Sequence, residues 1–279
     1  MLARHTLPPM PPLPQLSQLS QAPIAIVLAA GRGARMGGDL PKVLFEAAGK
    51  SLVEWVLEAL DAAGVHDRIV VVGYRAELVE AALCGIPGVS FAHQKEQRGT
   101  GDAVAAAAGL IESRLHAGRA GSHQPVVVVC GDSPMLRPQS VTGLLGQWAD
   151  RQAACLLGTA LTQDPTGLGR IVRDSRGIFQ KIVEQKEATT DELAICEVNM
   201  STYVFEARDL LRSLLQLQNA NASGEYYLTD CPGLLRAEGL AVDAVACLDP
   251  SETLSVNTPA QLAAVAEALQ RREGLPKPS

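Results

Sequence analysis

Continuous apolar runs constrain the fold of this chain more than any other feature. They occupy residues 24–30 (IAIVLAA), 68–74 (RIVVVGY) and 125–132 (PVVVVCGD). A strand that is apolar at nearly every position, rather than at every second one, is buried on both faces. Segments with apolar residues at helical spacing alternate with these runs, as in SLVEWVLEALDAAG at residues 51–64. This alternation predicts an α/β fold with βαβ units, in which an open, mostly parallel, Rossmann-like sheet carries helices on both faces.

The remaining pattern adds further elements. We expect a short helix at 76–83, a strand at 88–93, an Ala-rich helix over about 102–115 that Thr100 could cap, a helix near 141–151, strands near 154–160 and 198–205, and helices after Thr229 and Thr258. Residues 24–273 are interpreted as one domain. Residues 1–23 are rich in Pro, Gln and Ser and are interpreted as a disordered tail.

Charge and cysteine content exclude several classes of function. The chain has 24 Lys and Arg against 30 Asp and Glu, and it has no basic block, so we expect no nucleic-acid partner. No apolar stretch is long enough to span a bilayer, so we expect no membrane contact. The six cysteines are widely spaced and never form a C-x-x-C pair, which favours reduced thiols in a cytoplasmic protein.

The loop that follows the first strand has the composition of a phosphate site. Ligands of open α/β sheets bind beyond the carboxyl ends of the strands. Here that position holds LAAGRGARMGGDLPK, residues 28–42. Gly31 and Gly33 permit close approach of the backbone to phosphate, and Arg35 and Lys42 add cations. Neither a Walker loop nor a dinucleotide fingerprint is present. Taken alone, the loop is equally compatible with an ordinary connection between a strand and a helix.

Asp132 ends the most apolar run of the chain. A carboxylate in that position needs a hydrogen-bond partner or a cation. The alternative is that Asp132 caps the next helix, since Pro134 follows closely.

Further blocks accompany the loop in a fixed order and span nearly everything after residue 23. They are QKEQRGTGDA (94–103), CGDSP (130–134), GLGRI (167–171), IVEQKEAT (182–189), EVNMSTY (197–203), GEYYLTD (224–230) and SVNT (255–258). The set resembles the sugar-1-phosphate nucleotidyltransferase family. Within it the chain is most similar to the uridyltransferase domains of the bacterial bifunctional enzymes that make UDP-N-acetylglucosamine.

The resemblance implies a role for each matching position. Nucleotide-binding residues would be Leu28, Ala29, Ala30, Gly31, Gly33, Gln94, Gln97, Gly99 and Thr100. Arg35 and Lys42 would be catalytic, Asp132 and Asn257 would bind Mg²⁺, and the sugar would contact Gly169, Glu184, Asn199 and Tyr227. Bland alternatives remain at some positions: Gln94 and Gln97 as solvent-facing loop residues, and Glu184 as an exposed strand carboxylate.

The implied reaction transfers UMP from UTP to N-acetylglucosamine 1-phosphate and releases pyrophosphate. The attacking group is already a phosphate oxyanion, so no general base is required. Alternatives are the same chemistry on another sugar 1-phosphate or another nucleotide, and a non-catalytic regulatory or binding module of this fold. Retention of Lys42, Asp132 and Asn257 together argues against the module.

The sequence also departs from the family pattern. Ala34 replaces a threonine, Asp102 stands where histidine is common, and Met200 with Ser201 replaces a Thr-Gly pair beside Asn199, which would alter the N-acetyl pocket. Residues 117–124 lengthen a surface loop. No hexapeptide repeats occur, so we expect no acetyltransferase β-helix domain. Oligomeric state is left open.

Overall fold

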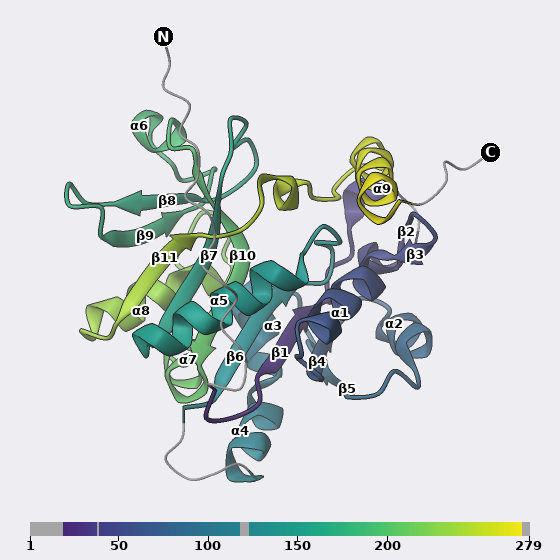
Figure 1. The fold of residues 1–279 in the computed structure, drawn as a ribbon, viewed down its shortest axis with the longest axis horizontal. Helices are drawn as coiled ribbons and strands as arrows, with labels where there is room; N and C mark the ends of the chain where they lie inside the picture. Colours follow the sequence, from purple (N-terminus) through teal and green to yellow (C-terminus); the bar gives the residue numbers. More distant parts are fainter. Residues whose placement is uncertain (1–18, 38, 118–122, 275–279) are drawn as a thin grey trace.

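One central sheet organises the molecule in the computed structural model, which describes residues 19–37, 39–117 and 123–274 (Figure 1). Its main path runs in the order β11-β7-β10-β6-β1-β4-β5. The strands are Ile24–Leu28 (β1), Asp67–Val72 (β4), Val89–His93 (β5), Pro125–Cys130 (β6), Cys155–Leu161 (β7), Glu197–Glu206 (β10) and Val242–Ala246 (β11).

Strand direction confirms the mostly parallel sheet. β1 pairs in parallel with both β4 and β6, β4 pairs in parallel with β5, and β11 pairs in parallel with β7. β10 is antiparallel to β6 and β7. Along the path of strands in the described residues, β10 alone therefore runs against the rest.

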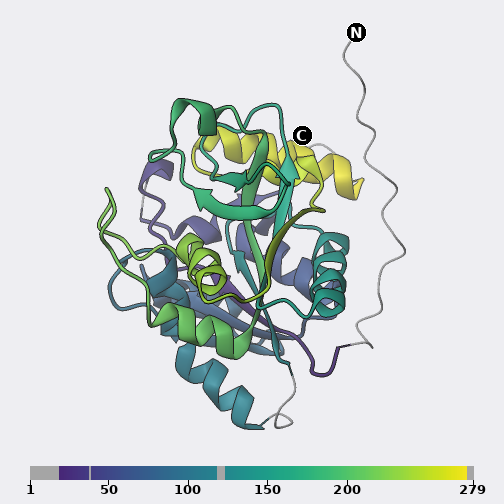
Figure 2. The same cartoon turned by 90° about the vertical axis from the view of Figure 1, so that its left-hand side faces the viewer.

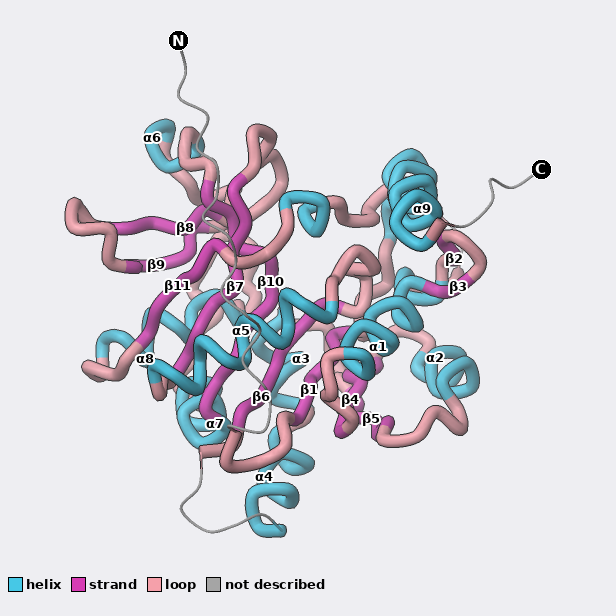
Figure 3. Tube along the Cα trace, in the orientation of Figure 1, coloured by secondary structure: helices cyan, strands magenta, loops and turns pink. Residues whose placement is uncertain are grey.

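Helices cover both faces of the sheet, as the sequence predicts (Figures 1, 2 and 3). One face carries Leu52–Ala62 (α1), Ala76–Leu83 (α2) and Pro138–Arg151 (α5), and the other carries Thr100–Ala106 (α3), Ala108–Ala117 (α4), Ala207–Leu214 (α7) and Cys231–Ala237 (α8). Ile24 and Ile26 of β1 pack toward α3 and α7, whereas Ala25 and Val27 pack toward α1 and α5. Burial on both sides explains the continuous apolar runs.

Three local expectations need correction. The Ala-rich segment is not one helix but two, α3 and α4, which meet at Ala107. Thr100 does not cap α3 but is its first residue, and its hydroxyl accepts a hydrogen bond from the Leu228 N–H at 3.0 Å. Asp132 is not a helix cap either, because Arg137 occupies the N-cap of α5 and Pro138 begins that helix.

Several short elements escape the sequence analysis. They are the hairpin strands Glu46–Ala47 (β2) and Lys50–Ser51 (β3), the hairpin strands Arg170–Arg173 (β8) and Phe179–Val183 (β9), Thr190–Leu193 (α6), and also α7 and β11. The strands β2, β3, β8 and β9 are too short or too polar to show a clear period. β8 joins the main sheet through a single pairing of Arg170 with Val198 of β10.

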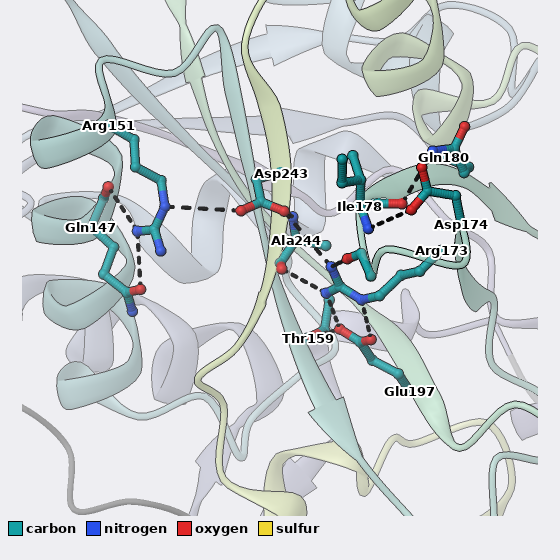
Figure 4. Close-up of polar contacts among 11 residues, drawn as sticks. Gln147, Arg151, Thr159, Arg173, Asp174, Ile178, Gln180, Glu197, Asp243 and Ala244 are labelled. Atoms are coloured by element: carbon teal, nitrogen blue, oxygen red, sulfur yellow. Dashed lines mark hydrogen bonds and ion pairs between the residues drawn. The ribbon is translucent and has the colours of Figure 1, made fainter.

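Arg173 fastens the β8–β9 hairpin to the main sheet (Figure 4). Its guanidinium donates to both carboxylate oxygens of Glu197 on β10, each at 2.7 Å, and to the carbonyl oxygen of Ala244 on β11 at 2.6 Å. Glu197 also accepts from the Thr159 hydroxyl on β7 at 2.7 Å. These contacts join four strands through one largely buried ion pair.

Replacing Arg173 should loosen this junction. We expect Arg173→Met to lower the free energy of unfolding by about 1–3 kcal/mol. The Glu197 carboxylate is largely shielded from water, and the substitution removes its charged partner. Arg176→Met is the matched control. Arg176 is exposed and pairs with Asp174 at the hairpin turn, so its loss should change stability by less than about 0.5 kcal/mol. Urea unfolding measures both, and equal losses would contradict the account.

The last helix, Pro259–Glu273 (α9), packs beside the β2–β3 hairpin at one end of the molecule (Figure 1). Val265 of α9 shares an apolar cluster with Met36 of the short 3-10 helix Ala34–Met36 (η2), in the loop after β1. Asn257 lies just before Thr258, which is the N-cap of α9. This cluster therefore holds Asn257 close to the loop.

The structure describes only part of the predicted N-terminal tail and of the lengthened loop. Residues 1–18 and 118–122 lie outside the described residues, so most of the tail and most of the lengthened loop are not described. Ser20 donates to the carbonyl of His123 at 2.9 Å, and Gln124 donates to the carbonyl of Ala22 at 2.7 Å. Ordered contacts thus begin before Ile24. Within the described ranges, no helix has both the length and the apolar character needed to cross a bilayer.

Candidate functional site

A cavity of about 260 Å³ lies at the carboxyl ends of β1 and β6. It collects backbone and small side chains that the sequence assigns to nucleotide binding, namely Leu28, Ala30, Gly31, Gly99 and Thr100. Its polar lining includes further predicted residues: Lys42, Gln94, Gln97 and Asp132. Because β1 and β6 are adjacent and parallel, the segments that follow them meet at one edge of the sheet.

Lys42 occupies the centre of the charged part of the site. Its Nζ lies 2.5 Å from Oδ2 of Asp132 and donates to Oδ1 of Asn257 at 2.8 Å. Arg35 Nη2 donates to the same Asn257 oxygen at 2.9 Å. The two predicted metal ligands and the two predicted catalytic cations thus form one connected group.

The donor set of Asp132 and Asn257 fits a divalent cation. Both residues direct an oxygen toward one positive charge, here the ammonium of Lys42. Oxygen ligands in small number suit Mg²⁺, which completes its shell with water and phosphate. Among the described residues no group of three or more His, Cys, Asp or Glu side chains is arranged to hold a metal. A metal ion at this site would therefore have two protein ligands, one carboxylate and one amide, and substrate phosphates would supply others.

The glycines of the loop after β1 have different tasks. Gly33 has a φ of +68°, and a Cβ there would lie 2.6 Å from Cβ of Lys42. Gly33 therefore lets the loop pack against the lysine stem rather than lining the cavity. Gly31 has no positive φ, and a Cβ there would meet no protein atom within 4 Å, so Gly31 lines the cavity with an open face. Ala29 is buried, and its N–H bonds to the Val71 carbonyl at 2.8 Å, so it serves the core.

The segment with Gln94, Gln97 and Gly99 is clamped by the loop before α8. Tyr226 donates its N–H to the Arg98 carbonyl at 2.7 Å, and its own carbonyl accepts from the Gly101 N–H at 2.8 Å. Gly99 has a φ of +112°, and a Cβ there would lie 2.5 Å from the Tyr226 oxygen. Only glycine fits this close approach. Gln94 is buried, which rules out the solvent-facing alternative for that residue, whereas Gln97 is exposed at the rim of the cavity.

Two of the predicted sugar residues, Gly169 and Asn199, contact each other at β10. Gly169 accepts the Asn199 N–H at 2.8 Å, and a Cβ on Gly169 would lie 3.6 Å from that of Asn199. The Asn199 amide donates to the hydroxyl of Tyr203 at 2.7 Å. Burial holds the pKa of Tyr203 well above its usual range, so this phenol stays neutral. Asn199 is thus fixed in place by neighbours on both sides.

Glu184 directly follows β9 and turns toward the segment around Tyr227. Its carboxylate is hydrogen-bonded with the side chain of Thr229. Burial is the main cause that raises its pKa, and the neighbouring charges of Glu187 and Asp230 add to the rise. Glu184 is therefore not the exposed strand carboxylate of the alternative interpretation. Tyr227 is half-buried at the start of the same segment.

Ser201 stands where the family has glycine, and its backbone adopts a conformation that glycine favours. Its φ is +50°, in the left-handed region that favours glycine, and the pairing of β10 with β7 shifts register there. Its N–H donates to Oδ1 of Asn199 at 3.2 Å. Its side chain bonds with the thiol of Cys130, whose pKa burial raises to about 12, so that thiol stays protonated. Met200 packs in a small apolar cluster with Leu168.

A second cavity, of about 540 Å³, adjoins the charged group through Arg35 and Asn257. Gly167 and Leu168 form part of its wall, and they lead directly into Gly169. The charged group therefore links the two cavities, and none of the four predicted sugar residues lies in the wall of the second.

Comparison with known proteins identifies the family. The profile of the MobA-like NTP transferase domain matches residues 25–225, well over half of the chain. This chain belongs to that family. The MobA-like span runs from β1 to Glu225 and so contains the whole wall of the first cavity. Asn257 and α9 lie beyond it.

Two curated relatives place the chain more closely. It is 42% identical over 248 residues to the bifunctional protein GlmU of Limosilactobacillus fermentum, which covers 89% of this chain and 52% of that protein. It is 41% identical over 248 residues to the bifunctional protein GlmU of Pelobacter propionicus, with the same shares covered. The chain therefore spans about half the length of the curated relatives it matches.

Solved structures share the fold of this chain at low sequence identity. Apo UDP-glucose pyrophosphorylase superposes with a TM-score of 0.67 at 15% identity over 90% of this chain and 99% of that chain. UDP-glucose pyrophosphorylase complexed with UDP-glucose gives 0.66 at 15% identity over 90% and 100%. These likenesses support the nucleotide-diphospho-sugar transferase type of fold.

Sequence reasoning misses some residues of the site. Cys130 and Glu225 line the first cavity. Each lies inside one of the sequence blocks quoted above, and that position could have indicated its place in the site. The pairing of Ser201 with Cys130 had no signal, because these side chains come from different strands.

Proposed function

We propose that this chain transfers UMP from UTP to N-acetylglucosamine 1-phosphate, giving UDP-N-acetylglucosamine and pyrophosphate. The observation that carries the proposal is the group in which Lys42 joins Asp132 to Asn257 beside a cavity lined by the predicted nucleotide residues. Membership of the MobA-like NTP transferase family and the identity to GlmU proteins support it.

Catalysis of this reaction requires the protein to position the reactants and neutralise charge, and it requires no general base. The phosphate oxygen of the sugar attacks the α-phosphorus of UTP in line with the departing pyrophosphate. Lys42 and Arg35 would turn from Asn257 toward the phosphates and neutralise the charge of the departing group. Mg²⁺ held by Asp132 and Asn257 would supply Lewis-acid neutralisation of the same phosphates. Cys130 offers no competing nucleophile, because its thiol stays protonated.

The sugar side favours a neutral hexose. Asn199, Glu184 and Tyr227 would offer the sugar an amide, a carboxylate and a phenol, and Gly169 would leave space for it. The raised pKa of Glu184 reports an environment that resists further negative charge, so an anionic sugar is disfavoured there. We place the reaction in the cytoplasm, since all six cysteines are free, as a reducing compartment requires.

A panel assay tests the substrate assignment. With Mg²⁺, we expect UTP and N-acetylglucosamine 1-phosphate to give the highest kcat/KM for pyrophosphate release. Hydrogen bonds to the N-acetyl group should give a margin over glucose 1-phosphate of about tenfold to a thousandfold. The internal hydrogen bonds of the Asn199 amide favour the lower part of that range. Preference for another sugar 1-phosphate would overturn the sugar assignment, and preference for another triphosphate would overturn UTP.

A further inference from the structure

Asp102 lies in the first turn of α3, where the family commonly has histidine. Its carboxylate has two partners, one on each oxygen. Oδ2 accepts from Nε2 of Gln94 at 2.9 Å, and Oδ1 accepts from Nη2 of Arg98 at 2.9 Å. The side chain of Asp102 is only 16% exposed, so water competes little for these bonds.

These contacts fix which end of the Gln94 amide faces the cavity. The same Nε2 also donates to the Gly99 carbonyl at 3.1 Å. A carboxylate and a carbonyl can only accept, so the end of the amide between them must be its NH₂ group. The amide oxygen is then directed away from Asp102. Gln94 lines the nucleotide cavity, and its oxygen is the part left to meet a ligand.

We propose that Asp102 is a positioning residue that selects uracil over cytosine by locking the Gln94 amide. This inference rests on the proposed use of UTP. The base-pairing edge of uracil carries a single donor, N3–H, and an amide oxygen held in the cavity accepts from it. The corresponding nitrogen of cytosine is an acceptor, so the locked oxygen meets a lone pair instead. Such a mismatch discriminates strongly in a buried site.

The lock depends on charge. A hydrogen bond to an ionised carboxylate is roughly twice as strong as one to a neutral carbonyl, so Asp102 restrains the amide more than Gly99 does. Arg98 holds the carboxylate in place, and its guanidinium lies 5.5 Å from the centre of the Tyr226 ring. Without Asp102, the amide can turn and present its NH₂ to the cytosine nitrogen.

The experiment compares UTP and CTP for the wild-type protein and for Asp102→Ala. Calorimetry with Mg²⁺ and no sugar gives the ratio of dissociation constants, and pyrophosphate release gives the ratio of kcat/KM. We expect Asp102→Ala to reduce the preference for UTP by about tenfold, mainly through better CTP binding. A purely structural defect would weaken both nucleotides in proportion and leave the ratio unchanged.

Further variants separate the lock from other roles. Asp102→Asn retains an acceptor oxygen and should keep most of the preference, and Glu96→Ala, which removes an exposed carboxylate of the same segment, should keep all of it. In a Gln94→Ala background, removal of Asp102 should change the ratio no further. A Gln94→Ala protein that still loses selectivity on Asp102→Ala overturns the inference, as does an unchanged ratio in the single variant. A wild-type protein without preference for UTP instead overturns the proposed function.

Discussion

Asp132→Asn is expected to lower kcat for pyrophosphate release at least about a hundredfold, as when a charge-stabilising contact at the transition state is lost. The substitution keeps the shape of the side chain but removes its charge. Asp132 is the carboxylate that faces Lys42 at 2.5 Å, and it is the only charged member of the proposed metal pair. Asp150→Asn, on the exposed end of α5, is the matched control and should retain full activity.

Magnesium dependence sharpens this test. If Asp132 holds the ion, the Asn variant should need more Mg²⁺ for half-maximal rate. Wild-type turnover of the Asn variant at ordinary magnesium would remove Asp132 from the metal site.

Lys42→Met is expected to lower kcat/KM for UTP by about a hundredfold to a thousandfold, with most of the loss in kcat. The side chain of Lys42 is 13% exposed, and its ammonium reaches both Asp132 and Asn257. Lys42→Arg should not restore activity, because a planar guanidinium cannot replace a compact ammonium between two oxygens. Lys50→Met provides the control, since Lys50 is exposed and pairs with Glu58 outside the cavity.

The split between binding and turnover gives this prediction a second readout. A Lys42→Met protein with unchanged kcat and raised KM would show uniform binding of the nucleotide instead. That outcome would contradict a role for Lys42 in neutralising the departing pyrophosphate.

The parts of the fold that the sequence predicts are those with strong local signals. β1, β4 and β6 are continuous apolar runs. Strands that are apolar on both faces must lie in the interior of a sheet that helices cover on both sides. Their order also explains why Lys42 and Asp132 meet, since adjacent parallel strands bring their following loops together. Only the family resemblance predicts a place for Asn257 in the site, because 215 residues separate it from Lys42 and no local pattern connects them.

What the sequence could not predict depends on tertiary contacts. The ion pair of Arg173 with Glu197 crosses strands whose register local patterns do not reveal. The hydrogen bond between Gln94 and Asp102 spans Gly99, whose positive φ and close approach to the Tyr226 backbone are tertiary features. Ser201 adopts a conformation usually reserved for glycine, which no propensity indicates. The roles of the individual site residues stay predictions that the variants above test.

The most direct measurement of the central claim is ³¹P NMR of one reaction that contains the protein, UTP, N-acetylglucosamine 1-phosphate and Mg²⁺. The account predicts that the signals of UTP and the sugar phosphate fall together, while those of UDP-N-acetylglucosamine and pyrophosphate appear in equal amounts. Release of inorganic phosphate without a nucleotide sugar, or no reaction under conditions in which UTP binds, would contradict it.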